Sequence, residues 1–135
     1  RVEPTTDFDK ITSLDYRQAD WISGWTREGK KSIEYGFITN YASQEPHEDF
    51  AELFGNYVIL SADEWEAKLV SADVIPTGRT RSGRSIIEEK IRIIKDYMLT
   101  TWGLDMDKLR AQLQARYPNF ARQDFTTMTS STTQQ

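Results

Sequence analysis

The chain has 135 residues, a formal net charge of −4 and a pI of about 5.0, and it contains no cysteine. This length suits a single domain with one hydrophobic core. The acidic balance argues against nucleic-acid binding, which needs a surplus of Lys and Arg on one face. Disulfides, thiolate metal sites and cysteine nucleophiles are excluded. No run of about 18 apolar residues occurs, so we expect no transmembrane helix.

The N-terminal third gives the weakest structural signals. Residues 1–12 are polar and predict an extended segment. Residues 13–24 have a partial helical spacing, which predicts a helix that packs Trp21 and Trp25 inward. The stretch 32–42 is irregular, and its β-branched and aromatic residues permit a short strand or an extended segment.

A clearer helix is predicted over 44–60, with Ser43 as its N-cap and Pro46 in its first turn. Apolar residues recur along it at the spacing of a core-facing helix. These residues are Phe50, Leu53, Phe54, Tyr57 and Val58. Asp49 is expected only to interact favourably with the helix dipole.

Two capping boxes, each a Ser with a Glu three residues later, predict where two further helices begin. The boxes are Ser61 with Glu64, before a helix over 62–72, and Ser85 with Glu88, at the start of a helix over 86–102. Gly103 is expected to end the second of these helices.

The last helix is predicted over 106–117, with Asp105 as its N-cap and Pro118 beyond its end. The fold class is therefore mainly α, with about five helices and little or no strand. We expect a single helical domain over 1–125. The polar, low-complexity segment 126–135 is expected to be a disordered tail.

The predicted helix over 44–60 carries a narrow acidic strip opposite its apolar face. At about 100° per residue, Ala51, Glu52 and Gly55 all fall within about 60° of Glu48. Gly in a helix interior costs roughly 1 kcal/mol relative to Ala, so small residues beside two carboxylates suggest a close approach by another group. We call these four residues the acidic strip.

Two interpretations of the acidic strip stay open. In a metal site, Glu48 would coordinate the metal and Glu52 would accept the N–H of a liganding histidine. On a solvated surface, the pair would be an ordinary i,i+4 pair of glutamates. His47 is the only histidine, and a zinc site needs at least three protein ligands. The chain is therefore not expected to build a zinc site by itself.

The stretch HEDFAELFG, residues 47–55, resembles the third-ligand helix of the gluzincins, the thermolysin-like zinc metallopeptidases. In that family a Glu ligand is followed four residues later by an acid that orients a zinc histidine. The resemblance implies that Glu48 is the zinc ligand and Glu52 the orienting acid. The family more often has Asp at the second position, and Glu52 departs from that pattern.

A longer resemblance covers most of the chain, through DFDKITSLDYRQADW, YGFITNYASQEPHEDFAELFGNYVI, EEKIRIIKDYM and LDMDKLRAQLQAR. These stretches are similar to the C-terminal portion of zinc-binding metallohydrolase lipoproteins of Bacteroidetes, found beside outer-membrane nutrient-import systems. That family carries an upstream HExxH with two zinc histidines and a general base. No HExxH occurs in these 135 residues. We therefore expect a C-terminal piece of a longer exported protein, a periplasmic or outer-membrane lipoprotein.

Other residues could contribute to a ligand site. The Arg-rich loop over 79–84 could bind an anionic group, although such loops are usually solvated and this one lacks a P-loop Lys. Tyr35, Tyr41 and His47 lie beside or at the start of the acidic helix, where they could line a substrate cleft. Half-buried packing is the more frequent role for such tyrosines.

Two functional hypotheses follow. The first is part of a zinc-dependent hydrolase of peptides or proteins, inactive alone because HExxH is absent. Zinc would polarise a carbonyl and activate water in the longer protein, and tight binding to this chain is not expected. The second is a non-catalytic helical module that contacts an outer-membrane import component. Under the first hypothesis, the missing partner helix would leave the acidic strip and its surrounding groove exposed, which could promote homodimerisation of this chain.

Overall fold

The computed structural model describes residues 6–12, 15–16 and 31–117 of the chain. These residues form α-helices and short 3-10 helices, and no strand occurs among them. The elements in chain order are α1 (Thr6–Ile11), η3 (Ser32–Tyr35), η4 (Tyr41–Ser43), α3 (Pro46–Ile59), α4 (Ala62–Ala72), α5 (Gly83–Trp102) and α6 (Met106–Arg116). The expected mainly helical fold is confirmed.

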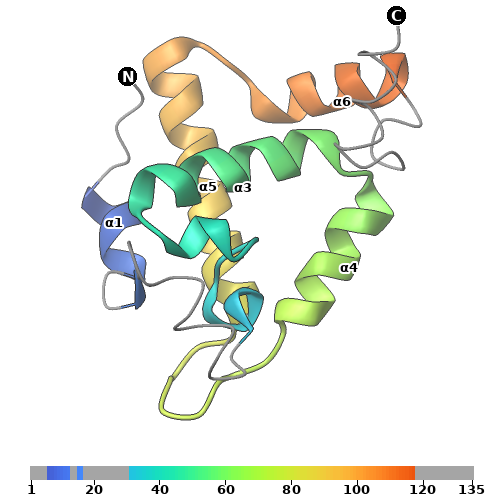
Figure 1. The fold of residues 1–135 in the computed structure, drawn as a ribbon. Coiled ribbons are helices and arrows are strands. Elements are labelled where there is room, and N and C mark those ends of the chain that lie inside the picture. Colours follow the sequence, from blue (N-terminus) through green and yellow to red (C-terminus); the bar gives the residue numbers. More distant parts are fainter. Residues whose placement is uncertain (1–5, 13–14, 17–30, 118–135) are drawn as a thin grey trace, which may run out of the picture.

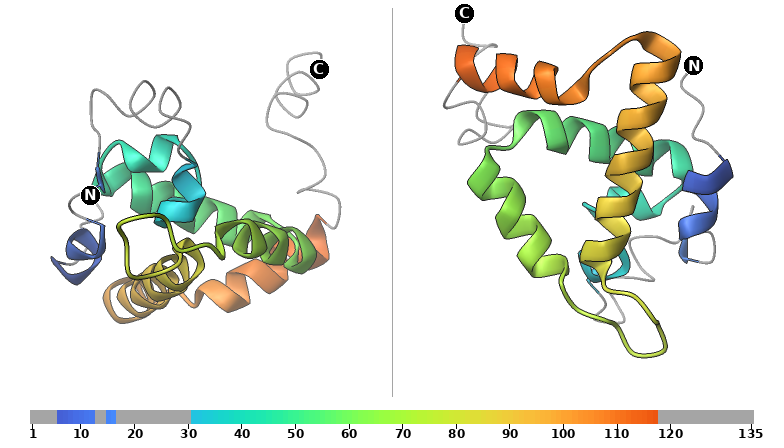
Figure 2. Two further views of the ribbon diagram at one scale, coloured as in Figure 1. Left: turned by 90° about the horizontal axis from the view of Figure 1, so that it is seen from below. Right: turned by 180° about the vertical axis from the view of Figure 1, so that it is seen from behind.

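The longest helix, α5, lies at the centre of this arrangement. It packs against α1, α3, α4, α6 and η3, and Figure 1 shows it crossing behind α3. Helix α6 runs alongside α3, and α4 turns back from the end of α3 toward the start of α5 (Figures 1 and 2). The helices thus enclose a core that lies mainly between α3 and α5.

The apolar faces of α3 and α5 supply most of this core. The buried hydrophobic residues of the two helices are Phe50, Leu53, Tyr57 and Val58 on α3, and Ile87, Ile91, Ile94 and Met98 on α5. Phe54 is half-buried and packs against the same cluster. The predicted apolar stripe of α3 is therefore confirmed, and the opposite edge of the helix is left for polar residues.

A charged pair lies inside the core. The side chains of Lys90 on α5 and Asp49 on α3 are both fully buried, and the Lys90 ammonium donates to Asp49 Oδ2 at 2.6 Å. Lys90 also donates to the Gly36 carbonyl oxygen at 2.9 Å, and the Tyr16 hydroxyl donates to Asp49 Oδ2 at 2.6 Å. The Lys90 Nζ lies 4.3 Å from the centre of the Phe37 ring. The expectation that Asp49 only favours the helix dipole was wrong, because its carboxylate faces inward.

Several helix ends confirm the sequence analysis. Both hydrogen bonds of the Ser61–Glu64 capping box are present, each at 3.2 Å. Gly103 ends α5 in the left-handed conformation, at φ 65°, which glycine adopts without strain. Asp105 caps α6 by accepting from the Lys108 N–H at 3.0 Å, and α6 ends before Pro118.

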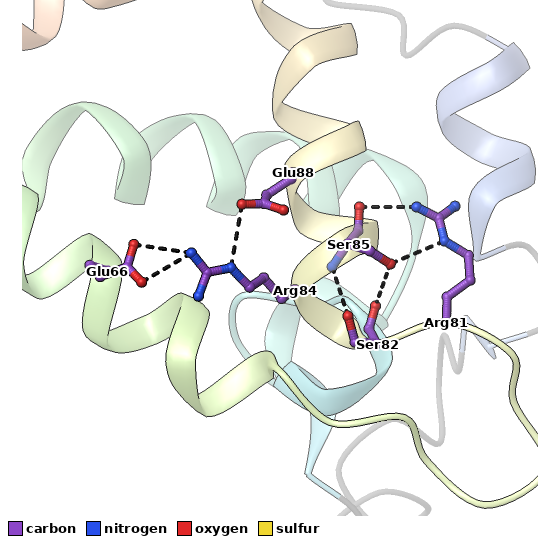
Figure 3. Close-up of polar contacts among 6 residues, drawn as sticks. All are labelled: Glu66, Arg81, Ser82, Arg84, Ser85 and Glu88. Carbon is purple, nitrogen blue, oxygen red and sulfur yellow. Dashed lines mark hydrogen bonds and ion pairs between the residues drawn. The ribbon is translucent and has the colours of Figure 1, made fainter.

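The Ser85–Glu88 capping box was a wrong prediction. The N-cap of α5 is Ser82, whose Oγ accepts from the Ser85 N–H at 3.1 Å (Figure 3). The helix begins earlier than expected, at Gly83, and Gly83 lies directly against the backbone of η3. A Cβ at Gly83 would lie only 2.1 Å from the Ile33 carbonyl oxygen. The cap itself is a local pattern, because Ser82 binds the N–H three residues later.

The chain before α3 also differs from expectation. The stretch 32–42 forms η3, a left-handed Gly36 with φ 95°, and the start of η4, rather than a strand or an extended segment. Ser43 is not the N-cap of α3, because its hydroxyl donates to the Asn40 carbonyl oxygen at 2.6 Å and Glu45 takes the N-cap position. Likewise, α1 makes part of the expected extended N-terminal segment helical.

Some expectations lie outside the described residues. This group contains the predicted helix over 13–24 apart from residues 15–16, the inward packing of Trp21 and Trp25, and the tail over 126–135. In the part that the structure describes, none of the helices has both the length and the apolar character needed to cross a membrane.

The buried ion pair leads to a stability prediction. Lys90→Met should lower the free energy of unfolding by about 3–5 kcal/mol, because it leaves the buried Asp49 carboxylate without its cation. The measurement is urea unfolding at neutral pH. Lys108→Met, at an exposed lysine, is the control and should change stability by less than about 0.5 kcal/mol.

A second variant separates charge from packing. Asp49→Asn combined with Lys90→Met should recover part of the lost stability, since no uncompensated buried charge remains. If Lys90→Met alone is as mild as Lys108→Met, the ion pair does not stabilise the core in the way argued here.

Candidate metal-ligand helix

The acidic strip lies along the edge of α3 that faces away from the core. Glu48 and Glu52 are half-buried, whereas Asp49, between them in sequence, points into the core. Ala51 is exposed, and a Cβ added at Gly55 would meet no atom within 4 Å. Among the residues that the structure describes, none therefore covers the strip at Ala51 and Gly55.

The Glu52 carboxylate is held by the segment that precedes α3. The Thr39 hydroxyl donates to Glu52 Oε1 at 2.8 Å. The same hydroxyl oxygen accepts from the backbone N–H of Ala42 at 3.1 Å. Glu52 is thus oriented by a side chain that is itself fixed to the backbone.

The Glu48 carboxylate has a neighbour from the same segment. Hydrogen bonding to Glu48 raises the pKa of the Tyr41 phenol, with smaller contributions from desolvation and from the negative charges of Glu48, Glu52 and Glu45. Tyr41 therefore keeps its proton at neutral pH and acts as a donor. Its side chain is also exposed, so it is accessible beside the strip.

Both contacts come from a short stretch that folds back along α3. The stretch 39–43 includes η4, which packs against α3. Tyr41 was identified from the sequence, but Thr39 was missed. A Thr that bonds the N–H three residues later is a recognisable local turn motif. Its contact with Glu52, thirteen positions away, depends on the fold.

The other candidate cleft residues lie in different surroundings. His47 is exposed at the start of α3, and its Nδ1 lies 3.5 Å from Glu45 Oε1. Tyr35 is half-buried in η3, beneath the Arg79 guanidinium, whose carbon lies 5.3 Å from the ring centre. Of the three candidates, Tyr41 is the one placed against Glu48 by its hydrogen bond.

The arginines of the loop over 79–84 all have carboxylate partners within the chain. Arg79 pairs with Asp15, Arg81 with Glu89 at 2.6 Å, and Arg84 with Glu66 at 3.0 Å. Arg81 also donates to the Ser85 carbonyl and hydroxyl oxygens (Figure 3). These contacts tie the loop to its neighbours and support a structural role over the suggested anion site.

The donor set of the strip fits one side of a zinc site. Carboxylate oxygens are zinc ligands, and a second carboxylate often accepts the N–H of a zinc-bound histidine. No group of three His, Cys, Asp or Glu side chains that could hold a metal ion occurs in the residues that the structure describes. Glu48 and Glu52 therefore fit the role of partial contributors to such a site.

The chain is similar to proteins that are described as putative zinc-binding metallo-peptidases. A family model described as "putative zinc-binding metallo-peptidase" matches residues 2–107. A crystal structure with the same description, from Bacteroides caccae, is similar with a TM-score of 0.68 and 28% sequence identity. The match covers 89% of this chain and 42% of that one, so this chain spans less than half of its relative.

A search of curated proteins gave no match. The family model nevertheless matches most of the chain, and the structural similarity extends over nearly all of it. This chain therefore belongs to the putative zinc-binding metallo-peptidase family.

Proposed function

We propose that this chain forms one wall of the zinc centre of a gluzincin-type peptidase, with Glu48 as the third protein ligand. The observation that carries the proposal is the arrangement of the acidic strip on a chain of this family. Glu48 and Glu52 lie one helical turn apart, on the edge of α3 away from the core. Each is contacted by a hydroxyl group from the stretch just before the helix.

The remaining zinc ligands would come from outside these 135 residues. A catalytic zinc site uses three protein ligands, and this chain offers one well-placed ligand candidate. We place two histidines and the general base in a HExxH segment of a longer protein. The Bacteroides caccae relative supports this placement, since more than half of its chain has no counterpart here.

The residues of this chain would then have distinct tasks. Glu48 would supply a negatively charged oxygen ligand, and Glu52 would accept the N–H of a zinc-binding histidine and fix its orientation. Bound zinc supplies a Lewis acid and lowers the pKa of its water. Tyr41 lies at the edge of the strip, where its phenol could also contact a peptide substrate.

The proposal also covers the substrate and the location of the longer protein. A peptidase of this kind acts on a peptide or protein, and this chain alone would be inactive because the general base lies elsewhere. We also propose an exported, lipid-anchored location for the longer protein. The rival hypothesis, a non-catalytic module of an import complex, requires that the longer protein carry no HExxH segment.

Zinc content tests the ligand assignment. In the longer protein, Glu48→Ala should abolish stoichiometric zinc, and Glu52→Gln should weaken zinc affinity by about 10–100-fold. The measurement is competition against a chelator of known affinity, with metal content determined by elemental analysis. Glu88→Gln, at an exposed glutamate of α5, is the matched control and should leave zinc affinity unchanged. Unchanged zinc content in Glu48→Ala would show that Glu48 is not a ligand.

The chain by itself should bind zinc weakly. One carboxylate ligand cannot hold zinc tightly when three are needed. Isothermal titration of the 135-residue chain with zinc should therefore give no stoichiometric binding at nanomolar affinity. Tight binding within a monomer would contradict the proposed division of ligands.

Gly55 offers a test of close approach to the strip. In this chain, Gly55→Ala should raise the free energy of unfolding by about 0.5–1 kcal/mol, because a Cβ meets open space and Ala favours the helix. In the longer protein the same change should be destabilising or should weaken zinc binding, since the partner segment would lie there. Urea unfolding of both proteins measures the difference.

A control and a contrary outcome complete the Gly55 test. Gly83→Ala should destabilise both proteins, because its Cβ would collide with the η3 backbone in either case. If Gly55→Ala stabilises the longer protein as it does this chain, no segment packs closely against the strip.

A further inference from the structure

We propose that Thr39 is a positioning residue that sets the orientation of the Glu52 carboxylate. The inference rests on the proposed function, because it concerns how Glu52 is presented to a zinc-binding histidine. It adds a residue outside the acidic strip, from the turn before η4. Two hydrogen bonds in the described part of the chain carry it.

The direction of the Thr39 hydroxyl proton follows from its two partners. A threonine hydroxyl has one proton to donate and two lone pairs that accept. The Ala42 N–H occupies an acceptor position at 3.1 Å, since an amide N–H can only donate. Glu52 Oε1 lies 2.8 Å from the same oxygen, and a carboxylate oxygen can only accept. The single proton is therefore directed to Glu52.

The anchoring of Thr39 matters as much as its contact with Glu52. Thr39 is β-branched, which restricts its side-chain rotamers, and its oxygen is fixed to the backbone of the following turn. That turn continues into η4, which packs against α3. The Thr39 hydroxyl is thus fixed by its bond to the Ala42 N–H and by the packing of η4 on α3, before any metal binds.

As a consequence, the two carboxylate oxygens of Glu52 have different roles. Oε1 is occupied by Thr39, which leaves the second oxygen to accept a histidine N–H. An unanchored glutamate has three rotatable side-chain bonds and would lose rotamer freedom when the metal site forms. Pre-orientation by Thr39 removes part of that cost.

The structural half of the inference can be tested on this chain. Thr39→Val keeps the β-branched shape but removes the hydroxyl, whereas Thr39→Ser keeps the hydroxyl. Side-chain coupling constants from NMR report whether Glu52 occupies one rotamer. We expect one dominant rotamer in the native chain and in Thr39→Ser, and averaging in Thr39→Val. A Glu52 side chain equally ordered in Thr39→Val would overturn the inference.

The functional half uses the longer protein and its affinity for zinc. Thr39→Val should weaken zinc binding by about threefold to tenfold, less than the loss expected for Glu52→Gln, and Thr39→Ser should restore it. Ser61→Ala, which removes the N-cap of α4 far from the strip, controls for general loss of stability. Its zinc affinity should match that of the native protein even if its Tm falls.

A double-mutant cycle shows whether Thr39 acts through Glu52. In the Glu52→Gln background, Thr39→Val should cause little further loss of zinc affinity, because its target is already removed. Independent, additive losses would overturn the inference. If Glu52→Gln weakens zinc binding and Thr39→Val does not, Thr39 is excluded while the proposed function stands. If Glu52→Gln has no effect, the proposed role of Glu52 fails and this inference fails with it.

Discussion

The ion pair between Lys90 and Asp49 is the constraint on which the rest of the structure depends. It is fully buried and joins α3 to α5, while further hydrogen bonds bring in Tyr16 and the backbone of Gly36. Burial lowers the pKa of the Lys90 ammonium, whereas the Asp49 charge and hydrogen bond act against that shift. A charge that is buried away from water must lie within hydrogen-bonding distance of an opposite charge. The contact between Lys90 and Asp49 therefore fixes how α3 is rotated about its axis.

That rotation decides what α3 presents on its outer edge. Glu48 and Asp49 are neighbours in the first turn, about 100° apart around the helix. Because Asp49 is bound inside the core, Glu48 lies on the outer edge of α3, and Glu52 lies on the same edge one turn further on. The stretch 39–43 then supplies hydroxyl groups to both glutamates. The candidate site is therefore built from a rigid helix and an adjoining turn, as precise ligand placement requires.

Local signals predicted much of this architecture, and tertiary contacts account for the rest. Ser61 and Asp105 cap their helices through bonds to residues three positions away, so their sequence patterns suffice. Ser85 is not a cap because Ser82, three residues earlier, takes that position with the same kind of local bond, to the N–H three residues later. Glu48 and Glu52 were identified from helical spacing and family resemblance. Asp49 was misjudged because its partner, Lys90, lies 41 positions away, although a lysine within an apolar stripe was a visible clue.

The inward-facing Asp49 also limits how this helix can be reused. A protein engineer who grafted α3 onto another scaffold, to borrow its pair of glutamates, would transfer an aspartate that has no place in an ordinary apolar interior. The new scaffold would need a buried cation at the matching position, or Asp49 would have to be replaced by an apolar residue. The portable unit is therefore larger than the helix and includes the lysine that neutralises it.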